Sequence, residues 1–188
     1  MQLINKSLIG AWLNATGTVV VALIEINELT SSHPASNKLI AIGEFFELVG
    51  SFFMGADNLE NSESMASNMM DGMGSSTAMV GNYMVFLDPS NPELGLFHEM
   101  LGDGMQALGS AMGAYNNMQN KQNKQMAGNT LQSLGAGLET LGAYAELQGD
   151  EKIASFLVAK GAILQALGSA IFAAITTREH RDSKNEGF

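Results

Sequence analysis

A pair of small residues seven positions apart recurs six times along this chain. The blocks begin at residues 10, 43, 67, 102, 128 and 161; all begin with glycine except the third, which begins with Ser67. The second member is always glycine. Alternate blocks begin about 59 residues apart, so two blocks make one unit and three units, about 1–61, 62–121 and 122–180, fill the chain. A fixed period of this kind predicts a repeat architecture in which each unit buries a face on its neighbours.

A large apolar residue follows each of these small residues by three positions, except at Thr77. Spacings of three and four place the glycines on one face of an α-helix. Glycine inside a helix costs about 1 kcal/mol relative to alanine, so close contact between helices has to compensate for it. The residues expected to form these helix-packing contacts are Gly10, Gly17, Gly43, Gly50, Gly74, Gly81, Gly102, Gly109, Gly128, Gly135, Gly142, Gly161 and Gly168.

Turn residues set the expected helix limits. The three prolines, Pro34, Pro89 and Pro92, all lie between blocks, so every block is free to be helical. Asn91 and Asp150 are expected to cap the helices that follow them. The sequence therefore predicts one all-α domain over 1–188. It has six antiparallel helices, paired as three hairpins, at approximately 3–29, 37–56, 62–87, 92–117, 122–147 and 150–178, followed by a polar tail over 181–188.

The net charge of −10 is concentrated in the middle of the chain, because residues 39–120 carry ten acidic residues and no lysine or arginine. This distribution argues against nucleic acid and anionic membrane surfaces as partners. It suits a solvated acidic face, which we favour, or a cationic partner or divalent counter-ions. The absence of cysteine excludes disulfides and thiolate metal sites.

A polar residue stands four positions after the start of every block. This polar column is a candidate ladder of amides and carboxylates at helix or protomer contacts; the alternative is the solvated polar edge of each helix. Its members are Asn14, Glu47, Asp71, Gln106, Gln132 and Gln165.

No catalytic, cofactor or metal site is expected. The three histidines are far apart in the sequence, and no Ser-His-Asp, HExxH, Walker or EF-hand pattern occurs. Met65, Met69 and Met73 share a helix face and could bind Cu(I), but methionine is more often an adaptable core residue. The sequence therefore predicts a protein that is not an enzyme.

Two segments raise the question of a membrane. Residues 7–24 and 153–177 are nearly apolar, and small-residue contacts are typical of transmembrane helices. The charges and amides of the other four segments disfavour spanning. The first and last helices are therefore expected to be central elements or an oligomer interface, formed by Trp12, Val19, Val20, Ile163, Ile171 and Phe172.

The segments 101–110 and 131–139 resemble an uncharacterised group of glycine-rich "repetitive" proteins of Bacillus-type spore formers. That group has no assigned activity, so the resemblance implies no functional residues. We expect a structural protein that assembles with itself into a homo-oligomer or filament. The alternative is a membrane-active helical protein of pore-forming or immunity type. Without a convincing signal peptide, a cytoplasmic or spore-associated location is expected.

Overall fold

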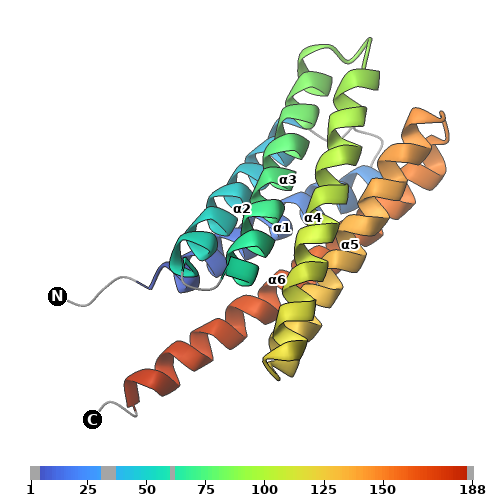
Figure 1. Cartoon of the computed structure of the whole chain (residues 1–188). Helices are drawn as coiled ribbons and strands as arrows, with labels where there is room; N and C mark the ends of the chain where they lie inside the picture. Colours follow the sequence, from blue (N-terminus) through green and yellow to red (C-terminus); the bar gives the residue numbers. More distant parts are fainter. Residues whose placement is uncertain (1–4, 31–36, 60–61, 186–188) are drawn as a thin grey trace.

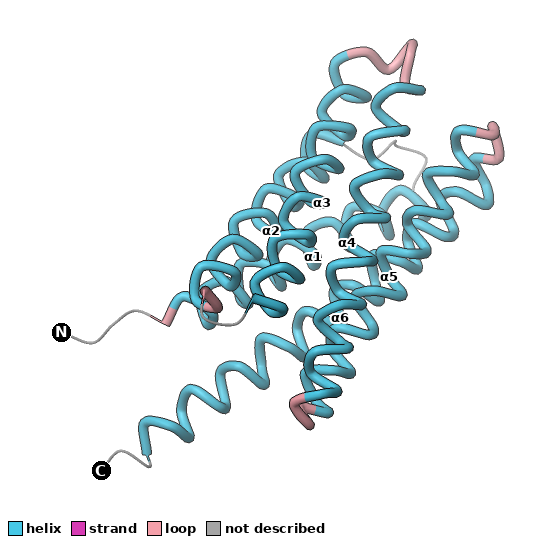
Figure 2. The backbone as a smooth tube through the Cα atoms, viewed as in Figure 1, coloured by secondary structure: helices cyan, strands magenta, loops and turns pink. Residues whose placement is uncertain are grey.

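The computed structural model describes residues 5–30, 37–59 and 62–185, and within these ranges the protein is all-α with no strand. The expected six helices are present, and their limits agree with the sequence to within a few residues except at the C-terminus. They are α1 Lys6–Thr30, α2 Asn37–Asp57, α3 Ser62–Leu87, α4 Glu93–Gln119, α5 Asn123–Leu147 and α6 Glu151–Asn185 (Figures 1 and 2).

The six helices form a closed ring, called the barrel below. Each helix packs against its neighbours in sequence and α1 packs against α6, while the backbones of all other pairs of described helices stay apart. Thr18 and Ser169 share a buried hydrogen bond of 2.5 Å between α1 and α6. Nearby, the indole Nε1 of Trp12 donates to Thr177 Oγ1 at 3.0 Å. The expectation that α1 and α6 are central elements is wrong, because each occupies the same kind of position in the ring as the other four.

Helix backbones touch within the pairs α1–α2, α3–α4 and α5–α6. A Cβ added at Gly17 of α1 would lie 2.5 Å from the carbonyl oxygen of Gly43 in α2. The equivalent distance from Gly74 in α3 to an oxygen in α4 is 2.6 Å, as it is from Gly135 in α5 to an oxygen in α6. At each of the thirteen glycines singled out above, an added Cβ would come within 3.0 Å of an atom in an adjacent helix. No side chain fits at such a distance without moving its neighbour.

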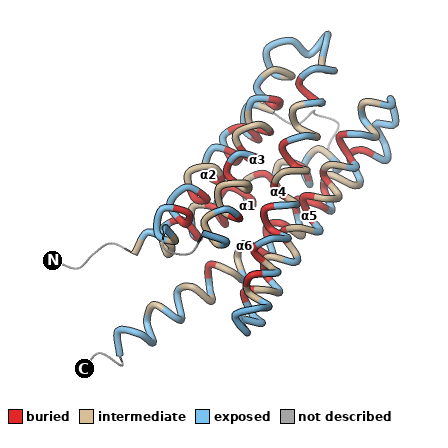
Figure 3. Tube along the Cα trace, in the orientation of Figure 1, coloured by how far each residue is buried: buried red, intermediate tan, exposed pale blue. Residues whose placement is uncertain are grey.

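The barrel reverses the usual distribution of side chains. Of the 16 buried apolar residues among those described, 12 are alanine, and 18 polar or charged residues are buried beside them. Large apolar side chains lie on the outside instead, where 32 are exposed. The buried residues follow the inner faces and seams of the helices (Figure 3). A water-soluble domain places most of its large apolar side chains inside.

Local expectations at the helix ends had mixed outcomes. Asp150 Oδ1 accepts a hydrogen bond from the backbone N–H of Ile153 at 3.2 Å, which confirms the predicted cap of α6. Asn91 does not cap α4, because its side chain donates to Asp88 at 3.2 Å and stabilises the preceding turn. The polar tail continues α6 up to Asn185, because its residues do not break the helix. Within it, Asp182 lies 3.6 Å from Arg178 one turn earlier. Residues 186–188 lie outside the described residues.

Candidate functional site: the polar interior of the barrel

The polar column of the sequence converges inside the barrel, with one residue from each helix. Five of its members are no more than 8 % exposed, and Asp71 is half-buried. The alternative of a solvated edge on each helix is therefore wrong for those five. The thirteen glycines face the adjacent helix in the pairs α1–α2, α3–α4 and α5–α6, and large apolar side chains lie on the outer surface. The polar column lies between these two faces and points inward.

Carboxyl groups from four helices lie at mid-depth in the barrel. We call this group the acidic belt: Glu44, Glu47, Asp71, Asp103 and Glu139. Glu44, Glu47, Asp103 and Glu139 are each no more than 5 % exposed. The expectation of a solvated acidic face is therefore wrong for the three of these that lie in the middle of the chain, Glu44, Glu47 and Asp103.

Hydrogen bonds connect the acidic belt across the interior. Gln106 Nε2 donates to Glu44 Oε2 at 3.0 Å and thereby joins α4 to α2, two helices that do not pack on each other. Ser51 Oγ donates to Asp71 at 2.5 Å. Gln165 donates to one oxygen of Glu139, whose other oxygen has no hydrogen-bond partner. The side chains of the belt are thus connected to one another and to their neighbours between the two ends of the barrel.

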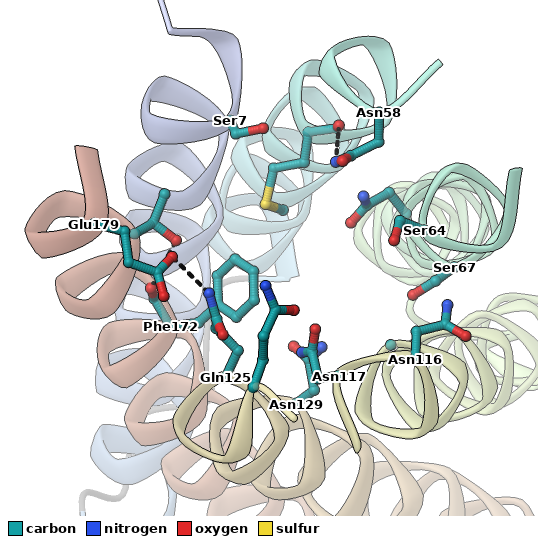
Figure 4. Close-up of a pocket in the computed structure, with 15 residues that line it drawn as sticks. Ser7, Asn58, Ser64, Ser67, Asn116, Asn117, Gln125, Asn129, Phe172 and Glu179 are labelled. Atoms are coloured by element: carbon teal, nitrogen blue, oxygen red, sulfur yellow. Dashed lines mark hydrogen bonds between the residues drawn. The ribbon is translucent and has the colours of Figure 1, made fainter. Parts of the chain in front are cut away.

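A cavity of about 230 Å³, called the amide pocket, lies at the end of the barrel where α1 begins and α6 ends. Figure 4 shows amides and hydroxyls from α1, α3, α4, α5 and α6 around it, together with Asn58 just after α2 and the ring of Phe172 on one side. Gln125 donates to Glu179 at 2.6 Å. A smaller cavity of about 30 Å³ shares Ser67, Asn129 and Phe172 with this pocket and reaches Asp71. The amide pocket therefore leads towards the acidic belt. Its polar lining is Ser7, Asn58, Ser64, Ser67, Asn68, Asn116, Asn117, Gln122, Gln125, Asn129, Thr176 and Glu179.

A second cavity, of about 400 Å³, lies at the opposite end, where α1 ends and α6 begins. We call it the acidic vestibule, because five glutamates line it together with Asn82. Asn82 is 2 % exposed; its amide nitrogen donates to Ala78 O at 3.2 Å, while its amide oxygen has no hydrogen-bond partner. The five glutamates are Glu25, Glu28, Glu99, Glu146 and Glu151.

No basic side chain balances these carboxyl groups inside the barrel. All nine lysine and arginine residues are exposed. The two cavities and the belt between them therefore form a polar axis lined by acidic groups.

Every helix carries exposed large apolar side chains. By length and composition, α1, α2 and α6 could each cross a membrane. Some of the charges that disfavoured the remaining helices, among them Asp103 and Glu139, lie inside the barrel. Large side chains cover the outside of α3, α4 and α5, including Phe86, Leu108 and Leu134, each at least 45 % exposed. The sequence argument against spanning counted residues without knowing which way they face; Glu63, Glu93 and Lys124, near the ends of their helices, are exposed.

Four of the six residues proposed as an oligomer interface, Trp12, Val19, Ile163 and Ile171, are exposed on α1 and α6. Val20 is half-buried. Phe172 faces inward, where it packs against a small apolar cluster that includes Ala11 and lines the amide pocket.

Residues considered for catalysis or metal binding are not brought together. Within the described ranges, no three histidine or acidic side chains are positioned to hold a metal ion. His98 bonds to the backbone oxygen of Leu94 near the start of α4, while His180 bonds to Asn5 near the end of α6. His33 lies outside the described residues.

Sequence reasoning missed several interior residues: Glu25, Glu44, Asn82, Asp103 and Glu139. A signal for some of them was present. Glu44 and Asp103 each lie three positions before a member of the polar column, and Glu139 lies seven after one, so all three share the inward face.

The comparisons with known proteins add one match. Residues 5–173 match a protein family described as a family of unknown function, DUF6944. The chain belongs to DUF6944. The DUF6944 match begins one residue before α1 and ends within α6, so it includes part of every helix in the ring and the whole acidic belt. Neither the search of curated proteins nor that of solved structures found a match.

Proposed function

We propose that this DUF6944 protein is a membrane-embedded helical barrel of pore type, with an acidic interior that admits small cations. The observation that carries the proposal is the reversed distribution of side chains, which are large and apolar outside and small, polar and acidic inside. Lipid covers an apolar surface on all sides, whereas a water-soluble monomer rarely exposes more than a few hundred Å² of contiguous apolar surface.

Helix length and packing support the membrane. The shortest helix has 21 residues, and at about 1.5 Å per residue it spans the roughly 30 Å of a bilayer core. Close backbone contact through glycine is typical of transmembrane packing, where small residues allow helices to approach. Ionisable residues in membrane helices face the bundle interior and mark ion or proton pathways.

The sign of the interior charge favours cations. Rings of aspartate and glutamate select cations in channels, and a cleft of one sign concentrates the opposite ion. The acidic belt fills the centre of the barrel with side chains, so passage requires these side chains to move. The interior thus resembles a closed state rather than an open channel.

The repeat architecture expected from the sequence is part of the membrane-barrel proposal. The glycine contacts within α1–α2, α3–α4 and α5–α6 support three antiparallel hairpins that assemble side by side into the ring. The resemblance to proteins of spore formers stays a hypothesis about origin, and it does not enter the argument.

Self-assembly in water is the second candidate, and the exposed apolar surface also favours it. An interface built on Trp12, Val19, Ile163 and Ile171 would cover α1 and α6 only. It would leave the apolar outer faces of α3, α4 and α5 in water. We therefore favour lipid over a second copy as the main cover.

A substitution on the outside of the barrel tests the membrane proposal. Leu108 lies near the middle of α4 and is 60 % exposed, whereas Leu87 ends α3 and is 63 % exposed. In lipid, Leu108→Arg should cost about 2.5–3.5 kcal/mol and lower the membrane-inserted yield, because charge at a helix centre is expensive. Leu87→Arg, at the end of its helix, should cost less.

The measurement is membrane fractionation with an alkaline wash, followed by detergent extraction. We expect the wild type in the washed membrane fraction. A wild type that stays soluble without detergent would overturn the membrane proposal and leave self-assembly. Cation passage is tested separately in proteoliposomes by comparing potassium and chloride flux; equal permeability would contradict the role of the acidic interior.

A further inference from the structure

The acidic vestibule is an open cavity with space for a ligand, whereas the acidic belt is a group of buried side chains. It lies at the end of the barrel rather than at its centre, and its volume of about 400 Å³ accommodates an ion with several waters. Glu25 is 7 % exposed and Glu99 is half-buried, while Glu146 and Glu151 stand at the rim. Carboxylates therefore surround this space from its wall to its opening.

The amide of Asn82 provides an independent indication of a ligand. Asn82 lines the same cavity, and its amide oxygen is shielded from bulk solvent and has no hydrogen-bond partner. A buried polar atom without a partner is costly and calls for an explanation such as an unseen water or ion. A cation would satisfy this oxygen and the neighbouring carboxylates together, whereas an anion would satisfy neither.

We propose that the acidic vestibule binds a hydrated divalent cation of the Ca²⁺ or Mg²⁺ class. The ligands are the carboxylates of Glu25 and Glu99 and the amide oxygen of Asn82. An all-oxygen set of carboxylates and carbonyls suits hard cations. Because the described residues do not provide a ready-made cage of three acidic groups, the ion keeps part of its water, as Mg²⁺ commonly does.

The role of this cation site rests on the proposed function: in a barrel that admits cations, a bound ion at the mouth marks where they enter. From this site the next carboxyl groups along the axis are those of the acidic belt. The vestibule would thus concentrate cations at one end of the path that the belt closes.

Binding is measured with Ca²⁺ and Mg²⁺ on detergent-purified protein, by isothermal titration calorimetry and by the rise in melting temperature with ion concentration. Two variants remove ligands without adding bulk: Glu99→Gln replaces one carboxyl ligand with an amide, and Asn82→Leu deletes the amide oxygen. Glu93→Gln is the matched control, because Glu93 lies in the same helix and near the same end, is exposed, and does not line the cavity.

We expect saturable binding by the wild type and by Glu93→Gln. Affinity should fall about tenfold or more in Glu99→Gln, since ligand charge sets cation affinity in such sites. Asn82→Leu should weaken binding as well, while its melting temperature without ions stays the same or rises. Absence of saturable binding by the wild type, or equal affinity in Glu93→Gln and Glu99→Gln, would overturn the site.

These outcomes are separable from those of the proposed function. Membrane insertion without ion binding would contradict the cation site and support the membrane barrel. Saturable ion binding by a protein that fractionates as soluble would support the cation site and contradict the membrane proposal.

Discussion

Two glycines of α5, two positions apart, have opposite surroundings. A Cβ at Gly135 would lie 2.6 Å from the carbonyl oxygen of Gly161, whereas a Cβ at Gly137 would meet nothing within 4 Å. Gly135→Ala should therefore destabilise by about 1–3 kcal/mol through overpacking. Gly137→Ala should stabilise by about 0.5–1 kcal/mol, because alanine loses less backbone entropy in a helix. Melting temperatures in detergent check both, and a Gly135→Ala variant as stable as Gly137→Ala would contradict the contact.

At this residue scale, spacing alone identified the glycines and the polar column. It did not show which way either faces. Glu44 and Glu47 share a helix face, which in a soluble protein is usually solvated, yet both are buried. Helical periodicity shows which residues lie together, whereas only the closure of the ring determines whether they meet water, lipid or one another.

At the scale of elements, the contact between α1 and α6 closes the ring and joins residues 151 positions apart in the sequence. The hydroxyls of Thr18 and Ser169 bond across this contact, and each also lies 3.1 Å from a backbone carbonyl oxygen of its own helix. Thr18→Val and Ser169→Ala should each cost about 0.5–1.5 kcal/mol. Together they should cost less than the sum, because removing both partners leaves no orphaned group.

Thr130 supplies the control for this double-mutant cycle. Its hydroxyl is exposed and donates only to the backbone oxygen of Met126 in its own helix, at 2.8 Å. Combining Thr130→Val with Ser169→Ala should be additive in unfolding measurements. Equal coupling in both cycles would mean that the α1–α6 hydrogen bond does not stabilise the closure.

Helix number and most helix limits were predictable because proline, glycine and capping residues act locally. The pairing of α1 with α6 was not predictable, since it joins the two ends of the chain and depends on the geometry of all five connections between the helices. The helical tail was missed for another reason. The sequence predicts a polar tail after the last helix, but none of its charged residues stops a helix and Arg178 pairs with Asp182.

At the scale of the whole molecule, basic residues gather at one end of the barrel. Six of the nine lie at the end with the amide pocket: Lys6, Lys121, Lys124, Arg178, Arg181 and Lys184. Lys38 and Lys152 lie at the end with the acidic vestibule, and Lys160 stands within α6 with its Nζ 4.0 Å from the ring centroid of Phe156. In membrane proteins with short connections, lysine and arginine are enriched on the cytoplasmic side.

This asymmetry predicts that the amide pocket faces the cytoplasm and the acidic vestibule faces the opposite side. The chain has no cysteine, so single substitutions report on each end without background. Ser90→Cys lies in the exposed α3–α4 connection at the vestibule end, and Asn120→Cys in the exposed α4–α5 connection at the pocket end. A membrane-impermeant maleimide should label Ser90→Cys in intact spheroplasts and Asn120→Cys only after lysis, because the bilayer shields the cytoplasmic end. The reverse labelling pattern would mean that the barrel has the opposite orientation, with the proposed cation site on the cytoplasmic side. Equal labelling before and after lysis would show that charge does not set its orientation.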